Sequence, residues 1–323
     1  MTGPTLGEGP DGPRLRSPAH GFCDDKDTRR LLRSRPPKLA LDWVERETRS
    51  RVLRVQALRG GMSSAVHLIT VQTAAAQRVE VVLRRYVRPE LNADEPDLAE
   101  REARALRVVE QIEVPTPRLL ALDPTGATVG VPAVLMTRLP GRVDWWPTDV
   151  ERWLRRLGEV LLPIHAGPLP PPGVLPVYEP YGQSSYQPPP WARRPRVWER
   201  AVELAFGPVP DLPAVLVQRD FHPGNVLWHY RRVSGVVDWQ AASVGPAVVD
   251  VAHCRSNLLG FDRSVAERFT TLWEQASGDS FHPWADVVTI VGFLDDLCSG
   301  WGSDRYLLED LLADAVAEFD ARS

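Results

Sequence analysis

The stretch between residues 214 and 239 constrains this chain most, because it places three polar side chains at the ends of short strands. An apolar run leads into Gln-Arg-Asp-Phe-His-Pro-Gly-Asn at 218–225. Two short apolar strands joined by a tight turn follow, and the second strand ends at Asp238. This hairpin is expected to return Asp238 to the side of Asn225. Asp220, Asn225 and Asp238 should therefore converge on one pocket.

Two carboxylates and one amide at strand ends are the set that phosphoryl transfer needs. In this interpretation Asp220 orients the attacking hydroxyl and takes its proton. The amide oxygen of Asn225 and the carboxylate of Asp238 hold Mg²⁺, which prefers hard oxygen ligands. The alternative for all three residues is turn chemistry, since Asp and Asn are common in turns and loops.

Composition excludes several other classes of protein. The chain has 323 residues, 43% of them hydrophobic and 25% charged, which suits two lobes of a globular protein. A net charge of −4 argues against a nucleic-acid binder. No apolar run is long enough to suggest a membrane span, and the first residues lack the apolar core of a signal peptide. Three scattered cysteines fit a reduced cytoplasm. For the oligomeric state we expect a monomer or a homodimer.

The charge is uneven along the chain. Residues 1–142 carry a net charge of +5, and residues 143–323 carry −9. One interpretation places an anion such as a nucleotide at the first lobe and a cation at the second. The other is solvated surface charge with no particular partner.

Residues 1–37 are rich in Pro, Gly and charge and are expected to form a disordered tail. Residues 38–138 form the first, nucleotide-binding lobe. A helix over 39–49 should bury Leu39, Trp43 and Val44, and a helix over 96–110 should bury one apolar face. Five strands are predicted in this lobe, at 52–58, 65–72, 79–87, 118–122 and 132–138.

Residues 139–323 form the second lobe, which begins at a Leu-Pro-Gly hinge. Apolar residues at helical spacing predict helices over 149–164 and 304–319. Ten prolines in residues 168–195 exclude regular structure there and predict a linker, a lid or a wrapped surface segment. The predicted fold is α+β and bilobal: an N-terminal five-stranded antiparallel sheet with one helix, then a mainly helical C-terminal lobe.

The order Asp220-x4-Asn225 and then Asp238 thirteen residues later resembles the catalytic core of the aminoglycoside phosphotransferase family. That family resembles the protein kinases in fold. The sequence around these residues, DFHPGNVLW and VSGVVDWQAASVGPAVVDVAH, is also similar to that of the family. The resemblance covers about residues 39–320. In the first lobe it is carried by Leu58–Val66, Val81–Arg84, Glu100–Ala103, Val114–Arg118 and Leu139–Gly141.

The resemblance implies ATP or GTP with Mg²⁺ as cofactors. It also implies that Gly60, Gly61 and Ser63 line the phosphates with backbone N–H groups. Arg84 would be the cation that touches the phosphates, and Glu102 would be its carboxylate partner. A plain hairpin turn is the alternative for the glycine pair.

Four further residues are assigned supporting positions. Strand alternation turns Arg85 away from the face that Arg84 occupies. The resemblance implies that His222 supports the loop and that Asp250 anchors it through backbone hydrogen bonds. Gln218 is a departure, since the family often has His there, and this affects the fine placement of the loop.

The acceptor is left open by the sequence. The family phosphorylates hydroxyls of aminoglycosides, other antibiotics, choline, homoserine and sugars. Asp295 and Asp296 would suit a polycationic acceptor, whereas Trp145, Trp146 and the 168–195 segment would suit an apolar one. The alternatives are a metabolite kinase or a degenerate nucleotide-binding protein. A protein kinase is disfavoured because no Asp-Phe-Gly or Ala-Pro-Glu follows Asp238.

Overall fold

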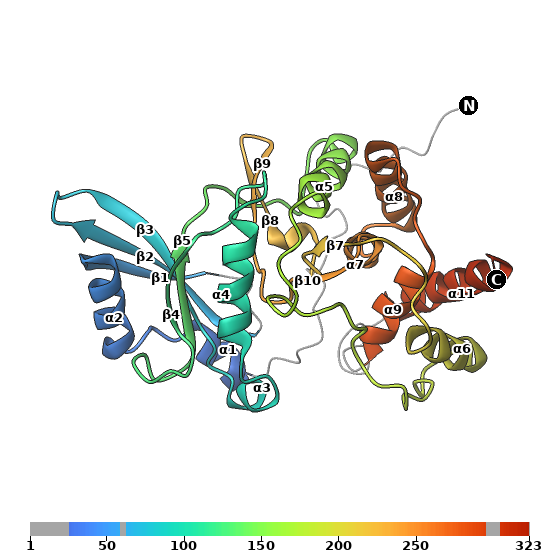
Figure 1. The fold of residues 1–323 in the computed structure, drawn as a ribbon, viewed down its shortest axis with the longest axis horizontal. Coiled ribbons are helices and arrows are strands. Elements are labelled where there is room, and N and C mark those ends of the chain that lie inside the picture. The colour runs from blue at the N-terminus through green and yellow to red at the C-terminus, as the bar shows by residue number, and fades with distance from the viewer. Residues whose placement is uncertain (1–25, 59–62, 295–303, 323) are drawn as a thin grey trace.

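The fold is described by a computed structural model that covers residues 26–58, 63–294 and 304–322. Two lobes lie side by side, a sheet-based lobe and a helical one (Figure 1). The predicted α+β bilobal architecture is confirmed. Four of the expected site residues, Gly60, Gly61, Asp295 and Asp296, lie outside the described residues.

The first lobe is built on a five-stranded sheet in the order β1-β2-β3-β5-β4, with every neighbouring pair antiparallel. Because successive side chains along a strand point to opposite sides, the sheet has two distinct faces. One face packs on α2 (Lys38–Thr48), and α4 (Leu98–Val109) packs at β4 and β5. The strands are β1 (Ser50–Ala57), β2 (Ala65–Thr73), β3 (Arg78–Arg85), β4 (Leu119–Asp123) and β5 (Ala133–Thr137).

One residue predicted to be buried on α2 is exposed. Ala40, Trp43 and Val44 are buried against the sheet, but Leu39 is 62% exposed, so its predicted burial is wrong. The buried stripe runs at i, i+3 and i+4 from Ala40, and Leu39 falls at its edge in the first turn of the helix.

The expectation of a disordered tail over residues 1–37 is wrong for its last part. Lys26–Arg33 form helix α1, which precedes α2. A single apolar anchor, Leu32, is buried with Ala65 and Val87. The Arg85 guanidinium also donates a hydrogen bond to the Ser34 carbonyl at 3.2 Å. One anchor among charged residues gives no periodicity, so only the contact with β2 and β3 reveals this helix.

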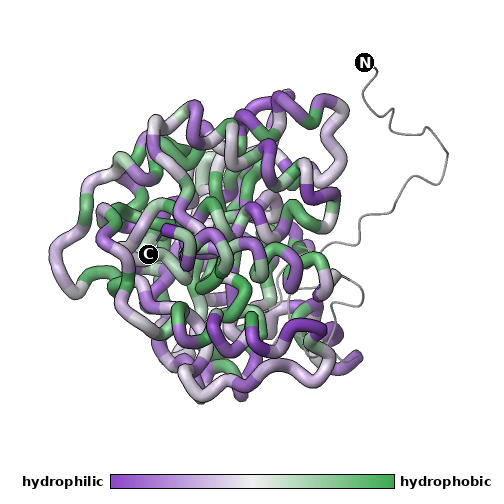
Figure 2. The backbone as a smooth tube through the Cα atoms, turned by 90° about the vertical axis from the view of Figure 1, so that its right-hand side faces the viewer, coloured by the Kyte–Doolittle hydropathy of each residue, from purple (hydrophilic) through white to green (hydrophobic). Residues whose placement is uncertain are grey.

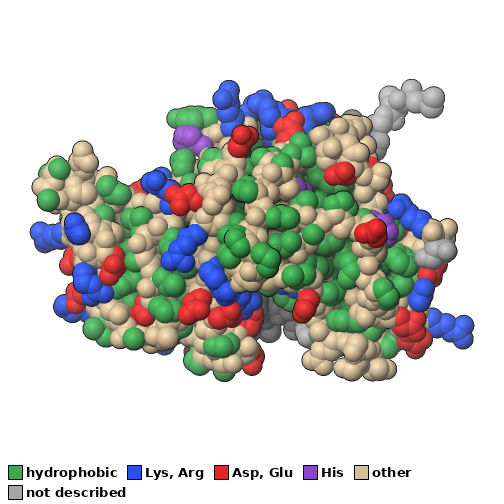
Figure 3. All heavy atoms as spheres, viewed as in Figure 1, with side chains coloured by type: hydrophobic (Ala, Val, Ile, Leu, Met, Phe, Trp, Pro, Cys, Tyr) green, Lys and Arg blue, Asp and Glu red, His purple; other side chains and the backbone are tan. Residues whose placement is uncertain are grey.

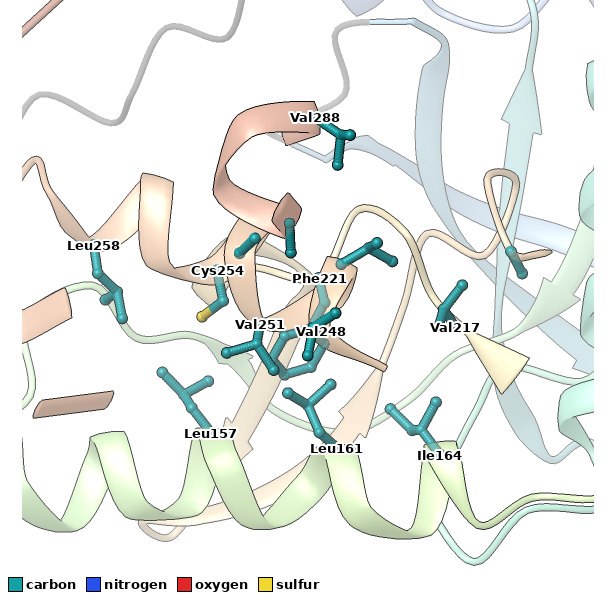
Figure 4. Close-up of a cluster of buried hydrophobic side chains, with 14 of the residues drawn as sticks. Leu157, Leu161, Ile164, Val217, Phe221, Val248, Val251, Cys254, Leu258 and Val288 are labelled. Atoms are coloured by element: carbon teal, nitrogen blue, oxygen red, sulfur yellow. The ribbon is translucent and has the colours of Figure 1, made fainter. Parts of the chain in front are cut away.

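The second lobe is mainly helical, and the helices predicted at 149–164 and 304–319 are confirmed. The apolar stripe of α5 packs on α7 around Phe221, which is fully buried (Figure 4). Its helices are α5 (Val150–His165), α6 (Pro195–Ala205), α7 (Val248–Leu258), α8 (Arg263–Ser277), α9 (Trp284–Gly292) and α11 (Asp304–Arg322).

Short strands occupy the region between the two lobes (Figure 1). A three-stranded sheet has the order β6-β8-β9, and a pair joins β10 to β7. A short helix, α3 (Pro89–Asp94), precedes α4. The strands are β6 (Arg142–Val143), β7 (Ala214–Val217), β8 (Val226–His229), β9 (Arg232–Val236) and β10 (Ser243–Pro246).

The predicted hinge is tied to this central sheet. Ser234 Oγ on β9 donates to the Pro140 carbonyl at 2.6 Å, and β6 pairs with β8 directly after the hinge. Gly141 has φ of 104°, and a Cβ there would lie 2.4 Å from Ser234 Oγ. The turn therefore requires glycine for conformation and for space.

The proline-rich segment is a wrapped surface segment, one of the three predicted alternatives. Val177 forms a parallel bridge with Val244 on β10. Tyr178 N donates to Val244 O at 2.8 Å, and Val244 N donates to Pro176 O at 2.9 Å. Its backbone thus extends the β7–β10 pair toward the surface.

The surface shows both charge signs on both lobes. Hydrophobic and hydrophilic stretches alternate along the tube in Figure 2. On the face shown in Figure 3, Lys and Arg are interspersed with Asp and Glu. Within the described ranges, no helix is both long and apolar enough to cross a membrane.

A buried ion pair between α7 and α9 generates a test of stability against pH. Arg255 Nε lies 3.0 Å from Asp286 Oδ2, and burial raises the pKa of Asp286 to about 6 despite the opposing effect of Arg255. Between pH 4 and 6 the folded state then holds a proton that the unfolded state releases. The free energy of unfolding should therefore fall as pH rises through that window.

We expect Asp286→Asn to remove up to roughly 3 kcal/mol of that pH dependence, because the amide does not titrate. Urea denaturation of both proteins from pH 4 to pH 7 measures it. Asp279→Asn, at an exposed residue in the segment between α8 and α9, is the control. Parallel stability curves for wild type and Asp286→Asn would contradict the prediction.

Candidate active site

The hairpin β8–β9 brings together the three polar residues that the sequence singled out. Asn225 ends the short 3₁₀ turn Pro223–Asn225, and Val237 N donates to its carbonyl at 2.9 Å. The Asn225 amide nitrogen donates to the Asp220 backbone carbonyl and to Asp220 Oδ2, each at 2.9 Å. Asp238 follows directly after Val237, beside Asn225.

The loop that carries Asp220 is anchored from below by a buried carboxylate. Asp250 on α7 is fully buried and accepts hydrogen bonds from Gln218 N at 2.9 Å and Arg219 N at 2.6 Å. His165 Nε2 on α5 lies 3.0 Å from the same carboxylate. Phe221, on the other side of Asp220, is buried in the core. Asp220 remains 37% exposed between these anchors, which leaves its carboxylate accessible.

Gln218 links the two acidic residues through its side chain. Its Oε1 accepts from Asp220 N at 2.8 Å, and its Nε2 donates to Asp238 O at 2.7 Å. An amide side chain can donate and accept hydrogen bonds at the same time, so Gln218 bonds both backbone segments without carrying a charge. Placement of the loop therefore does not depend on a titrating histidine here.

Two non-glycine residues of the site adopt left-handed backbone conformations. Arg219 has φ of 69° and Asp238 has φ of 63°. Such conformations are unfavourable for non-glycine residues and persist where the surrounding contacts enforce them. At Arg219 the contact is Asp250, and at Asp238 it is the pair of bonds to Gln218 and Arg84.

Arg84 forms the electrostatic centre of the site. Its Nη1 lies 2.7 Å from Glu102 Oε1 and 2.8 Å from Asp238 Oδ1, and its Nη2 lies 3.2 Å from Asp238 Oδ2. Its Nε donates to Ser64 Oγ at 2.7 Å, whereas Ser63 Oγ is more distant at 3.5 Å. The planar guanidinium serves three acceptors at once, which a lysine ammonium would not reproduce.

The charges of this cluster depend on one another because they are buried. Burial opposes the charged form of Arg84, but the carboxylates of Asp238 and Glu102 outweigh it and hold the pKa of Arg84 above its ordinary value. Burial raises the pKa of Glu102, and Arg84 opposes that rise. Tyr86 supplies a further bond, since its hydroxyl donates to Glu102 Oε2 at 2.9 Å.

The donor set fits a magnesium ion that is shared with a nucleotide. With the Asn225 nitrogen turned to Asp220, the amide oxygen is left for a ligand. The Asp238 carboxylate accepts from Arg84 through both oxygens, and its remaining lone pairs are hard donors of the kind that Mg²⁺ prefers. Across the described ranges, no three His, Cys, Asp or Glu side chains gather to hold a metal by themselves. Two protein ligands with phosphate oxygens and waters are a usual arrangement for Mg²⁺.

The sequence matches the model of the phosphotransferase enzyme family over residues 54–284. The chain belongs to this family. It is thus a small-molecule phosphotransferase, and the recognition made on its motifs is confirmed. A comparison with curated proteins found no match.

Solved structures of similar fold include three antibiotic kinases. Aminoglycoside phosphotransferase APH(4)-Ia, as a thermostable mutant with ADP and hygromycin B, is 16% identical with a TM-score of 0.59, covering 86% of this chain and 97% of its own. Macrolide 2'-phosphotransferase from Brachybacterium faecium is 17% identical with a TM-score of 0.54, covering 84% and 97%. Aminoglycoside 2'-phosphotransferase-IIIa with GDP is 15% identical with a TM-score of 0.51, covering 83% and 93%. At these identities the likeness shows the fold.

His222 supports the loop of this phosphotransferase. Burial lowers the pKa of His222, so the ring is neutral at pH 7. Its Nδ1 accepts from Gly224 N at 3.1 Å, so the proton is on Nε2, which lies 3.8 Å from Asp220 Oδ1. A Cβ on Gly224 would lie 2.5 Å from the His222 ring and 3.1 Å from Trp145. Glycine is therefore required for this close approach.

Arg219 connects the site of the phosphotransferase to the wrapped segment. Its guanidinium lies 5.1 Å from the Tyr178 ring centroid and 3.8 Å from that of Tyr181, and it donates to the Glu179 carbonyl. Cation–π contacts of this kind stabilise by about 0.5–2 kcal/mol. The residue next to Asp220 thus fixes the wrapped segment beside the site.

Sequence reasoning missed several residues of the site. Ser64, Tyr86 and Arg219 gave no local signal, because their partners are distant in sequence. His253, whose Nε2 lies 3.0 Å from Asp220 Oδ1, does have a signal. It follows Asp250 by three residues on α7, so both face the catalytic loop.

The Arg84 cluster gives a prediction for the stability of the phosphotransferase. Arg84→Met should lower the free energy of unfolding by about 3–5 kcal/mol, because it leaves two carboxylates without their cation. Arg138→Met is a matched control, since Arg138 pairs with exposed Glu80 at 3.3 Å on the same sheet. The control should lose at most about 1 kcal/mol in urea denaturation. Equal losses for the two variants would contradict the prediction.

Proposed function

We propose that this chain transfers the γ-phosphate of ATP or GTP, with Mg²⁺, to a hydroxyl of an aminoglycoside or another antibiotic. The observation that carries the proposal is the convergence of Asp220, Asn225 and Asp238 in front of the Arg84–Glu102 ion pair. A base, two oxygen ligands and a buried cation are the parts that phosphoryl transfer requires.

Asp220 acts as the base in this proposal. Its carboxylate is the most exposed of the set, at 37% against 27% for Asp238, and Asn225 holds one of its oxygens at 2.9 Å. The acceptor hydroxyl donates to Asp220, which orients the hydroxyl oxygen toward the γ-phosphorus. Asp220 takes the proton as the new P–O bond forms and the bond to the bridging oxygen breaks, which releases ADP or GDP. Most of the rate acceleration comes from positioning and electrostatic stabilisation.

The nucleotide binds on the Arg84 side of the site. Arg84 meets the phosphates, Glu102 holds Arg84 in place, and Gly60, Gly61 and Ser63 supply backbone N–H groups. Asn225 and Asp238 hold Mg²⁺, which neutralises charge on the phosphates when bound. The solved structures with ADP and GDP support a nucleotide at this fold's site.

Aromatic rings next to Asp220 favour an acceptor with a broad, partly apolar surface. Trp145 lies 6.1 Å from the His222 ring and stacks on Phe261 at 6.5 Å between ring centroids. Trp146 is 58% exposed beside it. Asp295 and Asp296 are proposed to meet ammonium groups of a cationic acceptor.

A screen separates this function from a metabolite kinase and from a protein that binds nucleotide without turnover. Thermal shift with Mg-ATP and Mg-GTP comes first. A coupled ADP or GDP assay with hygromycin B, a macrolide, choline, homoserine and simple sugars follows. Turnover with an antibiotic supports the proposal, and turnover with choline, homoserine or a sugar alone moves the function to metabolism. Nucleotide binding with no turnover of any compound would reject the kinase activity.

The base has a direct test. Asp220→Asn keeps the shape of the side chain and removes the proton acceptor, so kcat should fall at least about 10²-fold. Nucleotide affinity should stay close to that of the wild type. Asp211→Asn, in an exposed loop, is the control. Weakened nucleotide binding with unchanged kcat would reject the role.

The metal has a separate test. Activity should vanish with EDTA and return with added Mg²⁺. Asp238→Ala should lower affinity for Mg-nucleotide as well as turnover, because it removes a proposed ligand and one partner of Arg84. Isothermal titration and steady-state kinetics measure the two effects. Normal turnover by Asp238→Ala would show that the metal ligand is misassigned.

Salt dependence reports on the acceptor class. If several carboxylates meet the ammonium groups of an aminoglycoside, its KM should rise steeply with ionic strength, since exposed pairs are weak and screened. The KM for nucleotide should change less. Asp295→Asn with Asp296→Asn should raise the acceptor KM with little change in kcat. A flat salt response in an active enzyme would indicate a neutral or apolar acceptor instead.

A further inference from the structure

Asp220 is contacted by a second polar side chain that its expected partners do not include. His253 on α7 contacts the Asp220 oxygen that Asn225 does not bond, with its Nε2 3.0 Å from Asp220 Oδ1. Asn225 holds the other oxygen, Oδ2, at 2.9 Å. The two carboxylate oxygens are therefore held from two separate elements, the catalytic loop and α7.

The His253 imidazole is itself held in place. Its side chain is 13% exposed, and its ring packs edge-on against Phe293 with 5.4 Å between centroids. The centroid of the His222 ring lies 5.9 Å from that of His253. Helix α7 is in turn fixed to the catalytic loop by Asp250, one turn before His253. The ring therefore belongs to the same rigid unit as the loop that it contacts.

We propose that His253 is a positioning residue for phosphoryl transfer, holding the Asp220 carboxylate in the plane that receives the acceptor hydroxyl. The proposal rests on the assignment of Asp220 as the base. In it, His253 Nε2 supports Asp220 Oδ1 across the 3.0 Å contact, while the Asn225 amide nitrogen donates to Oδ2. His253 touches neither nucleotide nor acceptor and acts through Asp220 alone.

The physical reason lies in the freedom of a carboxylate. A single hydrogen bond to one oxygen leaves the group free to rotate about its terminal torsion, which has a broad minimum. A second polar contact on the other oxygen, that of His253, restricts this rotation. Each carboxylate oxygen has two lone pairs, so the two contacts leave room for the acceptor hydroxyl. Misplacement of a reacting group by about 1 Å lowers rates by about 10²-fold.

His222 does not replace His253 in this role. Its Nε2 lies 3.8 Å from Asp220 Oδ1, beyond hydrogen-bond distance, and its Nδ1 already accepts from Gly224 N. The two imidazoles thus have different roles. His222 orders the turn before Asn225, and His253 orients Asp220.

Two substitutions at one position test the proposal. His253→Leu removes the polar contact and keeps an apolar side chain against Phe293. His253→Gln keeps a polar nitrogen, because its Nε2 is as many bonds from the Cα as the imidazole Nε2. His229→Leu, at an exposed histidine at the end of β8, is the matched control. Melting temperature and Kd for Mg-ATP are measured for each protein.

Two transfer reactions are measured. The first is single-turnover hydrolysis of Mg-ATP, with water as the acceptor, which needs no identified substrate. The second is steady-state phosphorylation of whichever of hygromycin B, a macrolide, choline, homoserine or simple sugars the wild type turns over. His253→Leu should lower the single-turnover rate constant of hydrolysis and the steady-state kcat of phosphorylation, each about 10- to 100-fold. Its Kd for Mg-ATP should stay within about twofold, and His253→Gln should recover kcat to within about threefold of wild type.

The outcomes separate the two proposals. A wild type that transfers phosphate to no acceptor, water included, overturns the kinase function and this inference with it. An active wild type with His253→Leu within threefold of its kcat overturns the positioning role alone. A His253→Gln variant as slow as His253→Leu also overturns it. So does a loss of nucleotide affinity by the same factor as kcat, since that shows a general structural role.

Discussion

The buried ion cluster of Arg84 is the interaction on which the rest of the site depends. The Arg84 guanidinium on β3 contacts Ser64 directly before β2, Glu102 on α4 and Asp238 after β9. Charges this deeply buried are tolerated only when they are paired, so each partner fixes the position of the others. The cluster therefore links the two lobes at the point where the proposed phosphates and metal bind.

The catalytic loop combines rigidity with access in a different way. Residues on both sides of Asp220 are fully buried: Gln218 bonds two backbone segments, and Phe221 fills the core between α5 and α7. Asp250 holds the backbone from below. Arg219 and Asp220 emerge between these anchors, so the Asp220 carboxylate is accessible on a backbone that is held from both sides. A base that must meet a hydroxyl at one distance and one angle requires such a support.

The surroundings of Asp220 extend this arrangement toward the acceptor. A row of rings runs from Phe293 through His253 and His222 to Trp145 and Phe261. Arg219 adds the tyrosines of the wrapped segment. These groups come from α7, the catalytic loop, the hinge region and the proline-rich segment. The acceptor side is thus assembled from the whole second lobe, whereas the nucleotide side depends on one sheet and one helix.

The sequence by itself determined the elements and the reaction family. Alternating strands, the helical stripes of α4, α5 and α11, and the ordered spacing of Asp220, Asn225 and Asp238 are local signals, readable because pairing and periodicity act over a few residues. The structure alone decided which residues hold these in place. The contacts of Tyr86 with Glu102, Asp250 with the loop, and His253 with Asp220 join residues 16 to 33 positions apart or on different elements. Helix α1 and the exposure of Leu39 were likewise settled by packing. No local pattern encodes such contacts, since they exist only once distant elements have packed together.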